Sequence, residues 1–137
     1  METKLQVGVK ALIKNLEGKY LVLKRNPEKY PEIEDLWDIP GGRIDPGIPL
    51  LENLSREIKE ETSLELAGEP KLLAAQDILR IEGRHVIRLT YAAEAKGQVQ
   101  IVGDEHSEYQ WLGLEELKAL DGLDKYLREL LETKTLL

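Results

Sequence analysis

The chain of 137 residues contains no cysteine and only two histidines. Without cysteine it can form neither a disulfide nor a thiolate metal site. The histidines, His85 and His106, are far apart in the sequence, and we expect both to be structural. Any bound metal is therefore expected to have mainly oxygen ligands, which favours Mg²⁺ or Mn²⁺.

The chain also lacks features of membrane proteins and of proteins that bind nucleic-acid polymers. No apolar run approaches the roughly 20 residues that span a bilayer, and residues 1–10 are too polar for a signal peptide. The formal net charge of −7 weighs against a nucleic-acid polymer as partner, because such binding needs a basic surface. We expect a cytoplasmic protein with a small ligand, and a bound metal would make an anionic ligand acceptable.

Length and composition predict a single domain over residues 1–137, since 42% of the residues are hydrophobic and 33% are charged. Alternating apolar residues predict strands over 6–16, 19–24, 37–39, 72–81, 85–95, 98–102 and 108–112, the first two joined as a hairpin. Helices are predicted over 49–62, 114–120 and 123–132. This order predicts an α/β fold with a mixed sheet flanked by helices.

The helix predicted over 49–62 carries carboxylates on or beside its apolar stripe. At about 100° per residue, Glu57 and Glu61 both fall within roughly 60° of Leu54. Carboxylates are rarely buried without partners, and with Glu60 beside them these side chains repel one another, so a divalent cation would stabilise the cluster. The alternative is a solvated run of charge at a helix end. The stripe itself is predicted to comprise Leu50, Leu51, Leu54 and Ile58.

Residues 41–64 resemble the Nudix box, a motif of one hydrolase family; they read GGRIDPGIPLLENLSREIKEETSL. The matching positions are Gly42, Arg56, Glu57, Ile58, Glu60, Glu61 and Leu64. Two positions depart from the motif, because Ile48 stands where the family has Glu and Ser63 where it has Gly. The preceding WDIPGG and the order of the elements also fit the family.

The resemblance implies a Nudix-type α/β/α sandwich and a metal-dependent hydrolase. Such an enzyme cleaves a pyrophosphate bond in a nucleoside diphosphate linked to another moiety, by attack of water on phosphorus. The sequence around Leu79-Arg80-Ile81 lacks the subgroup markers for ADP-ribose and for diadenosine polyphosphates. This favours nucleoside triphosphates, including damaged nucleotides. A homodimer is compatible with the sequence.

The resemblance also implies roles for individual residues. Glu57 and Glu61 would be the main ligands of Mg²⁺ or Mn²⁺, joined by the backbone carbonyl of Gly42. Glu60 would be a further ligand or the general base, and Arg56 would orient the carboxylates.

A carboxylate from a later loop often joins such sites. Glu108 is favoured here because it precedes an aromatic strand, with Glu105 as the next candidate. Arg25, at the end of the second predicted strand, is a candidate for contact with a substrate phosphate.

The two departures set the limits of the resemblance. Ser63 would cap the helix less well than the left-handed Gly of the family. Ile48 has no carboxylate to support the metal site, so we expect Asp45 or Glu52 to supply that supporting carboxylate. The alternative is a catalytically impaired Nudix-fold module that binds nucleotides or has a regulatory role.

Overall fold

The first two strands send alternate side chains into two separate hydrophobic clusters. In the computed structural model, which describes residues 2–133, these strands are β1 (Lys4–Ile13) and β2 (Tyr20–Arg25). Leu12 and Val22 enter one cluster, whereas Ala11 and Leu21 enter the other. Because side chains of a strand alternate between its two faces, the strands lie between two layers of packing.

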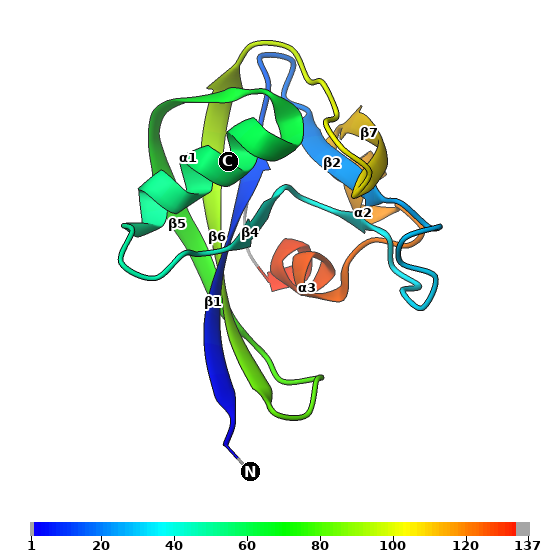
Figure 1. The fold of residues 1–137 in the computed structure, drawn as a ribbon. Coiled ribbons are helices and arrows are strands. Elements are labelled where there is room, and N and C mark those ends of the chain that lie inside the picture. Colours follow the sequence, from blue (N-terminus) through cyan, green and yellow to red (C-terminus); the bar gives the residue numbers. More distant parts are fainter. Residues whose placement is uncertain (1, 134–137) are drawn as a thin grey trace.

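The strands form two sheets (Figure 1). The four-stranded sheet has the order β4-β1-β6-β5 and includes β4 (Gly41–Arg43), β5 (Glu65–Ile78) and β6 (Arg84–Lys96). The three-stranded sheet has the order β3-β2-β7 and includes β3 (Trp37–Asp38) and β7 (His106–Leu112). Strand β1 is parallel to β6 and antiparallel to β4, so the larger sheet is mixed, as predicted.

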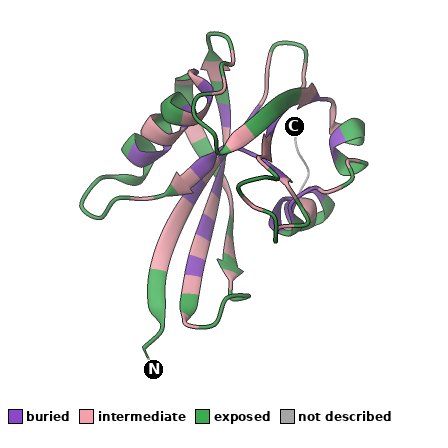
Figure 2. Ribbon diagram, turned by 45° about the vertical axis from the view of Figure 1, so that its right-hand side comes forward, coloured by how far each residue is buried: buried purple, intermediate pink, exposed green. Residues whose placement is uncertain are grey.

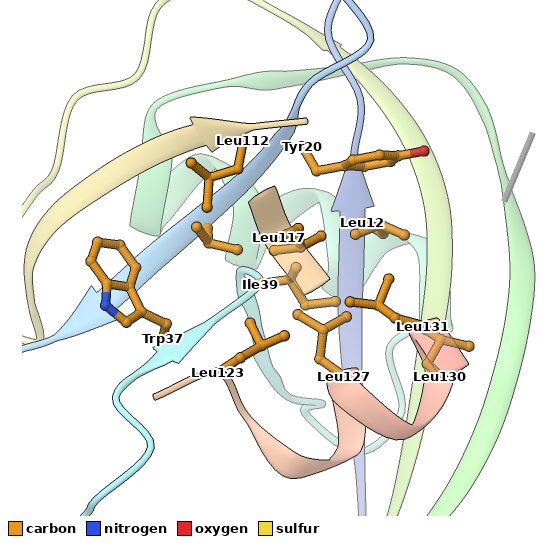
Figure 3. Packing of buried hydrophobic residues seen from close by; sticks show 11 residues of the cluster. Leu12, Tyr20, Trp37, Ile39, Leu112, Leu117, Leu123, Leu127, Leu130 and Leu131 are labelled. Carbon is orange, nitrogen blue, oxygen red and sulfur yellow. The ribbon is translucent and has the colours of Figure 1, made fainter. Parts of the chain in front are cut away.

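Helices cover both sides of this arrangement. Helix α1 (Leu50–Thr62) packs Leu54 and Ile58 into the cluster that contains Ala11. Helices α2 (Leu114–Lys118) and α3 (Lys125–Thr133) lie against the other cluster, where Leu127 and Leu130 pack beside Leu12 (Figure 3). The predicted α/β/α sandwich is therefore confirmed. No helix within residues 2–133 is long and apolar enough to cross a membrane.

Helix α1 is buried along only part of its surface (Figure 2), and its buried residues, Asn53, Leu54, Ile58 and Thr62, differ from the predicted stripe. Leu50 and Leu51 are 37% and 38% exposed, so their assignment to the buried face was wrong. Asn53 is fully buried instead, because its side chain forms hydrogen bonds with the backbone of the preceding loop. The helix ends as expected at Ser63, which adopts the left-handed conformation with φ of 68°.

The predicted hairpin between the first two strands forms only at its turn. The Asn15 amide donates to the carbonyl of Lys19 at 2.9 Å, and Lys14 forms an isolated bridge with Tyr20. Beyond this turn the strands separate, because β1 pairs with β4 and β6 whereas β2 pairs with β3 and β7.

The strand predicted over 98–102 is absent from the structure, and that prediction was wrong. The segment crosses the end of α1, where the Gln100 amide donates to the Thr62 carbonyl at 2.9 Å. Val99 and Ile101 still pack on the core, which explains their alternation in the sequence. Strand β5 in turn begins at Glu65, earlier than predicted, and contains register shifts around Pro70.

Candidate functional site

A close approach between β4 and α1 places the Glu57 carboxylate against the backbone of Gly42. A Cβ atom at position 42 would lie 2.5 Å from Glu57 Oε2, so no larger residue fits there without displacing the carboxylate. Position 41 is restricted as well, because a Cβ atom there would lie 2.0 Å from the Val9 carbonyl oxygen. The two glycines thus allow β4 to pair with β1 and still leave room for a carboxylate from α1.

Glu61 lies one helical turn after Glu57 and is largely buried, with 11% of its side chain exposed. Its Oε1 accepts a hydrogen bond from the Gly41 amide at 3.3 Å. Burial raises the pKa of its carboxyl to about 7; the charge of Glu57 acts in the same direction, and that of Lys10 opposes it. The pair is therefore a carboxylate site that favours a compensating cation.

His106 from β7 faces Glu61, with Nε2 at 3.6 Å from Oε2. Burial lowers the pKa of this imidazole to about 4, and the charge of Lys10 lowers it further, so the ring is neutral near pH 7. No feature of the sequence indicated that this histidine lies beside the glutamates. His85, by contrast, lies elsewhere and contacts Asp77.

Arg56 connects the box helix to the loop before it. Its guanidinium reaches Asp45 Oδ2 at 2.8 Å and Glu57 Oε1 at 3.0 Å. Glu60 is farther, at 3.8 Å from Nε, and its side chain is 61% exposed. Arg56 therefore fixes Glu57 and Asp45, as a residue that orients the carboxylates should, whereas Glu60 stays at the solvent side.

Asn53 supports this loop from within the fold, a role that the sequence did not suggest. It donates to the Ile48 carbonyl at 2.8 Å and accepts from the Asp45 amide and from Arg56, each at 2.9 Å. The Ile48 side chain is 39% exposed. Glu52 is exposed and has no hydrogen bond or ion pair to another side chain in the described chain. Of the two expected substitutes for the missing box glutamate, the contacts favour Asp45.

A β-bulge decides which late residue approaches the glutamates. Glu108 pairs with Lys24, but Arg25 pairs with His106, so Ser107 is the extra residue. The bulge turns His106 toward Glu61 and leaves Glu108 on the other face of the sheet.

The preference for Glu108 over Glu105 is therefore not supported by the geometry. Glu105 is the late carboxylate whose negative charge reaches Glu61 and contributes to its raised pKa.

A buried ionic network lies beside this site and was missed by the sequence analysis. Arg88 of β6 donates to both oxygens of Asp38, at 2.9 and 3.0 Å, and lies 3.3 Å from Asp124 at the start of α3. Lys10 donates to the Ile39 carbonyl at 3.2 Å and faces Asp38 at 3.4 Å. The one available signal was a pair of charges, Asp38 and Arg88, inside otherwise apolar strand sequences.

This network forms the floor of a cavity of about 260 Å³. Gly41 and Gly42 form part of its wall, so the cavity adjoins the glutamate pair through the backbone of β4. Arg25, the residue expected to meet a substrate phosphate, also lines it.

The arrangement of Glu57, Glu61 and Gly42 fits a hard divalent cation. Two carboxylates from successive helical turns meet beside a glycine backbone, and all their donor atoms are oxygen. Within residues 2–133 no three His, Asp or Glu side chains are close enough together to form a ready-made metal site. The protein would thus supply a pair of carboxylates and leave other positions of the cation to backbone, water and substrate.

Comparison with known proteins agrees with this geometry. The family model for the NUDIX domain matches residues 4–133. The chain belongs to the Nudix hydrolase family. Among solved structures, the MutT protein from Methanosarcina mazei Go1 is 28% identical with a TM-score of 0.80, over 96% of this chain and 94% of that one. The MutT Nudix hydrolase from Burkholderia pseudomallei is 30% identical, also with a TM-score of 0.80, over 96% and 99% of the two chains.

The relatives of this Nudix chain differ in the substrates that their names give. A Bacillus subtilis (strain 168) protein with a proposed 8-oxo-dGTP diphosphatase activity is 30% identical over 77% of this chain and 64% of its own length. The asymmetrical bis(5'-nucleosyl)-tetraphosphatase of Mus musculus is 38% identical over 58% of this chain and 57% of its own. The Nudix chain thus spans less than two thirds of these relatives.

Proposed function

We propose that this Nudix protein hydrolyses a pyrophosphate bond in a small nucleotide-like substrate and depends on Mg²⁺ or Mn²⁺. The observation that carries the proposal is the pair of partly buried carboxylates, Glu57 and Glu61, held against Gly41 and Gly42. A structural ion pair would bring a protein cation between them. Here the Arg56 guanidinium forms an ion pair with Glu57 but not with Glu61, and Lys10 acts on Glu61 through its charge.

Each residue has a definable task in this reaction. Glu57 and Glu61 would hold the cation, with the Gly42 carbonyl as a further oxygen donor, and Arg56 keeps the Glu57 carboxylate in place. A bound Mg²⁺ or Mn²⁺ withdraws charge from the phosphate oxygens and makes water more acidic. Glu60, exposed at the edge of the site, accepts the proton as water oxygen bonds to phosphorus and the anhydride P–O bond breaks. The phosphate group on the other side of the broken bond leaves with the bridging oxygen, as an anion.

The two named relatives define the range of substrates to test. One has a proposed activity on 8-oxo-dGTP and the other acts on a dinucleoside tetraphosphate. Both kinds of molecule are nucleoside polyphosphates, in which a nucleoside diphosphate is linked to a further phosphate group. We therefore propose nucleoside polyphosphates, including damaged ones, as the substrate class.

A Nudix-fold module with weak or no turnover is the second candidate. Ile48 favours it, because the position contributes no carboxylate and its side chain is exposed. The contacts of Asp45 and Asn53 with Arg56 oppose it, since they hold the loop and the arginine without help from position 48.

The test is a hydrolysis assay of nucleoside triphosphates, 8-oxo-dGTP, dinucleoside polyphosphates and nucleotide sugars with Mg²⁺ or Mn²⁺. We expect turnover that Glu57→Gln combined with Glu61→Gln reduces by at least about 100-fold. Glu129→Gln on α3 is the matched control, because Glu129 is exposed and far along the chain from the box. Turnover that survives the double substitution would exclude the proposed site, and ligand binding without turnover in the unaltered protein would support the second candidate.

A further inference from the structure

Asn26, the residue that follows β2, uses all of its hydrogen-bonding groups to join two loops. Its carbonyl accepts two backbone N–H groups of the turn over residues 26–30, at 3.1 and 3.0 Å, and its Oδ1 accepts a third at 3.1 Å. Its own backbone N–H donates to the Glu105 carbonyl at 2.8 Å, and its Nδ2 donates to the Asp104 carbonyl at 3.0 Å. Asn26 therefore fastens this turn to the segment that precedes β7.

The two ends of the Asn26 side chain have different tasks. Asp104 presents a carbonyl, which only the amide nitrogen of Asn26 can satisfy as a donor. Glu28 presents a backbone N–H, which only the side-chain oxygen can accept. The oxygen therefore stabilises the turn of which Asn26 is itself a part, whereas the nitrogen holds the distant segment.

The segment held by Asn26 lies directly beside the glutamate pair. Glu105 immediately precedes His106, whose Nε2 is 3.6 Å from Glu61 Oε2. His106 in turn pairs with Arg25, the neighbour of Asn26, so the contact with Glu105 continues the pairing of β2 and β7 beyond the bulge. The charge of Glu105 acts on Glu61 and on His106. Asn26 thus fixes the backbone from which a third carboxylate approaches the pair.

The position of this backbone matters because the Glu105 side chain is exposed. An exposed glutamate samples many rotamers, so the place from which its carboxylate can reach a cation is set by its main chain. A carboxylate that starts from a fixed point loses less conformational entropy when it meets the cation than one on a mobile loop does.

A second contact between the two loops is weaker than that of Asn26. Lys29 Nζ lies 3.0 Å from Asp104 Oδ1, but these side chains are 42% and 79% exposed. Such a pair of exposed, mobile side chains contributes little. Asn26 is half-buried and has a short side chain that is held at both ends, so it is the main connection.

We propose that Asn26 is a positioning residue, which holds residues 104–106 so that the Glu105 carboxylate adds its charge to the cation site of Glu57 and Glu61. The inference rests on the proposed function, because it concerns the same cation. Asn26 lies outside the box and touches neither glutamate of the pair. It acts only through the segment that it holds.

The test measures Mn²⁺ binding by calorimetry in the absence of substrate, so that no turnover is needed. Asn26→Asp keeps an oxygen for the turn but replaces the donor to the Asp104 carbonyl with a second acceptor. We expect the Kd for Mn²⁺ to rise about tenfold, the low end of what the loss of a supporting partner costs a metal site. The added negative charge would by itself favour a cation, so a weaker affinity reports the lost position.

The chain offers a matched control in the turn between β1 and β2. Asn15 Oδ1 accepts the backbone N–H groups of Glu17 and Lys19, at 3.0 and 2.9 Å. Asn15→Asp makes the same chemical change in a turn of the same kind and should not weaken Mn²⁺ binding. Lys29→Ala should change the Kd by less than about twofold, because its ion pair is exposed.

A double-variant cycle shows whether Asn26 acts through Glu105. Glu105→Gln should weaken Mn²⁺ binding by at least as much as Asn26→Asp does. With Glu105→Gln already present, Asn26→Asp should cause no further loss, since the charge that it positions is gone. A tenfold loss in both backgrounds would overturn the inference, because Asn26 would then support the fold of the site in general.

The same variants separate the inference from the proposed function. Turnover that depends on the glutamate pair, together with Mn²⁺ binding that Asn26→Asp leaves unchanged, would retain the function and refute the positioning role. Mn²⁺ binding that follows the predicted cycle in a protein without turnover would support the positioning role and refute hydrolysis. An unaltered protein that binds no Mn²⁺ would refute both.

Discussion

Opposing influences act on the Glu61 carboxylate, and burial is the strongest of them. Burial raises its pKa to about 7, while the Lys10 charge and the Gly41 amide favour the ionised form. An ordinary glutamate has a pKa near 4.5. The folded protein without metal therefore holds a proton on Glu61 at pH values where the unfolded chain has released it.

This difference predicts a pH dependence of stability. Since the folded state binds more protons than the unfolded state between about pH 4.5 and 7, the contribution of Glu61 to stability is lost as pH rises through that window. Relative to the Glu61→Gln variant, the metal-free protein should lose on the order of 2–3 kcal/mol between pH 4.5 and 8. Urea unfolding of both proteins across this pH range measures their free energies of unfolding.

The comparison with the variant is needed because His106 acts in the opposite direction. Its pKa is lowered to about 4, so its contribution grows as pH rises from about 4 to 6.5. This pH dependence from His106 should occur in both proteins, so it cancels in the difference between their free energies of unfolding. Parallel stability curves for the two proteins would contradict the assignment to Glu61.

Among the elements, the ion pair between Arg88 and Asp38 links strands of the two separate sheets. Arg88 belongs to β6 of the four-stranded sheet and Asp38 to β3 of the three-stranded sheet, and Asp124 extends the contact to α3. Both residues of the pair are almost fully buried. Arg88 holds the pKa of the Asp38 carboxyl well below its usual range.

Removal of Arg88 alone should be strongly destabilising. Arg88→Ala leaves Asp38 as a buried charge without its main partner, and we expect the free energy of unfolding to fall by about 3–5 kcal/mol. Denaturant unfolding of the variant measures this loss. The combined change of Asp38→Leu and Arg88→Met removes both charges of the pair and should regain part of the loss, because Lys10 and Asp124 then each lack a partner. A loss below about 1 kcal/mol for Arg88→Ala would show that the pair does not hold the sheets together.

For the whole molecule, the distribution of charge matters more than its sum. The chain carries −7, yet five basic and two acidic side chains line its cavity, a formal charge of +3, and the neighbouring glutamate pair favours a divalent cation. Metal and anionic substrate would therefore occupy adjoining sites of opposite charge. The net charge counted from the sequence weighs against a broad basic surface that binds nucleic-acid polymers. It does not exclude a local cationic site for a small anion.

Metal binding at the glutamates should stabilise the entire fold. A ligand that binds only the folded state adds about 2.7 kcal/mol at a concentration 100 times its Kd. Thermal unfolding with and without Mg²⁺ or Mn²⁺ should therefore show a higher Tm for the unaltered protein. The Glu57→Gln and Glu61→Gln double variant should show no such increase. An equal rise in both proteins would place the metal elsewhere.

Local periodicity alone was enough to predict the helix that carries the glutamate pair. The spacing of Leu54, Glu57 and Ile58 placed a carboxylate at the edge of the buried face of α1, and the structure agrees. The last helix was predicted over 123–132 from the sequence, and its Leu127, Leu130 and Leu131 are buried at helical spacing. These predictions succeed because the repeat of a helix is set by its backbone, whatever the rest of the chain does.

The tertiary structure alone decided which distant residues meet. Lys10, Asp38, Arg88 and Asp124 come together only through the pairing of strands from two sheets and the docking of α3. A single bulge in β7 placed His106 at the site and turned Glu108 away. Sheet register and bulges depend on the partner strand, so no local pattern records them. The glutamate helix is thus a property of its own sequence, whereas the cationic cavity beside it is a property of the fold.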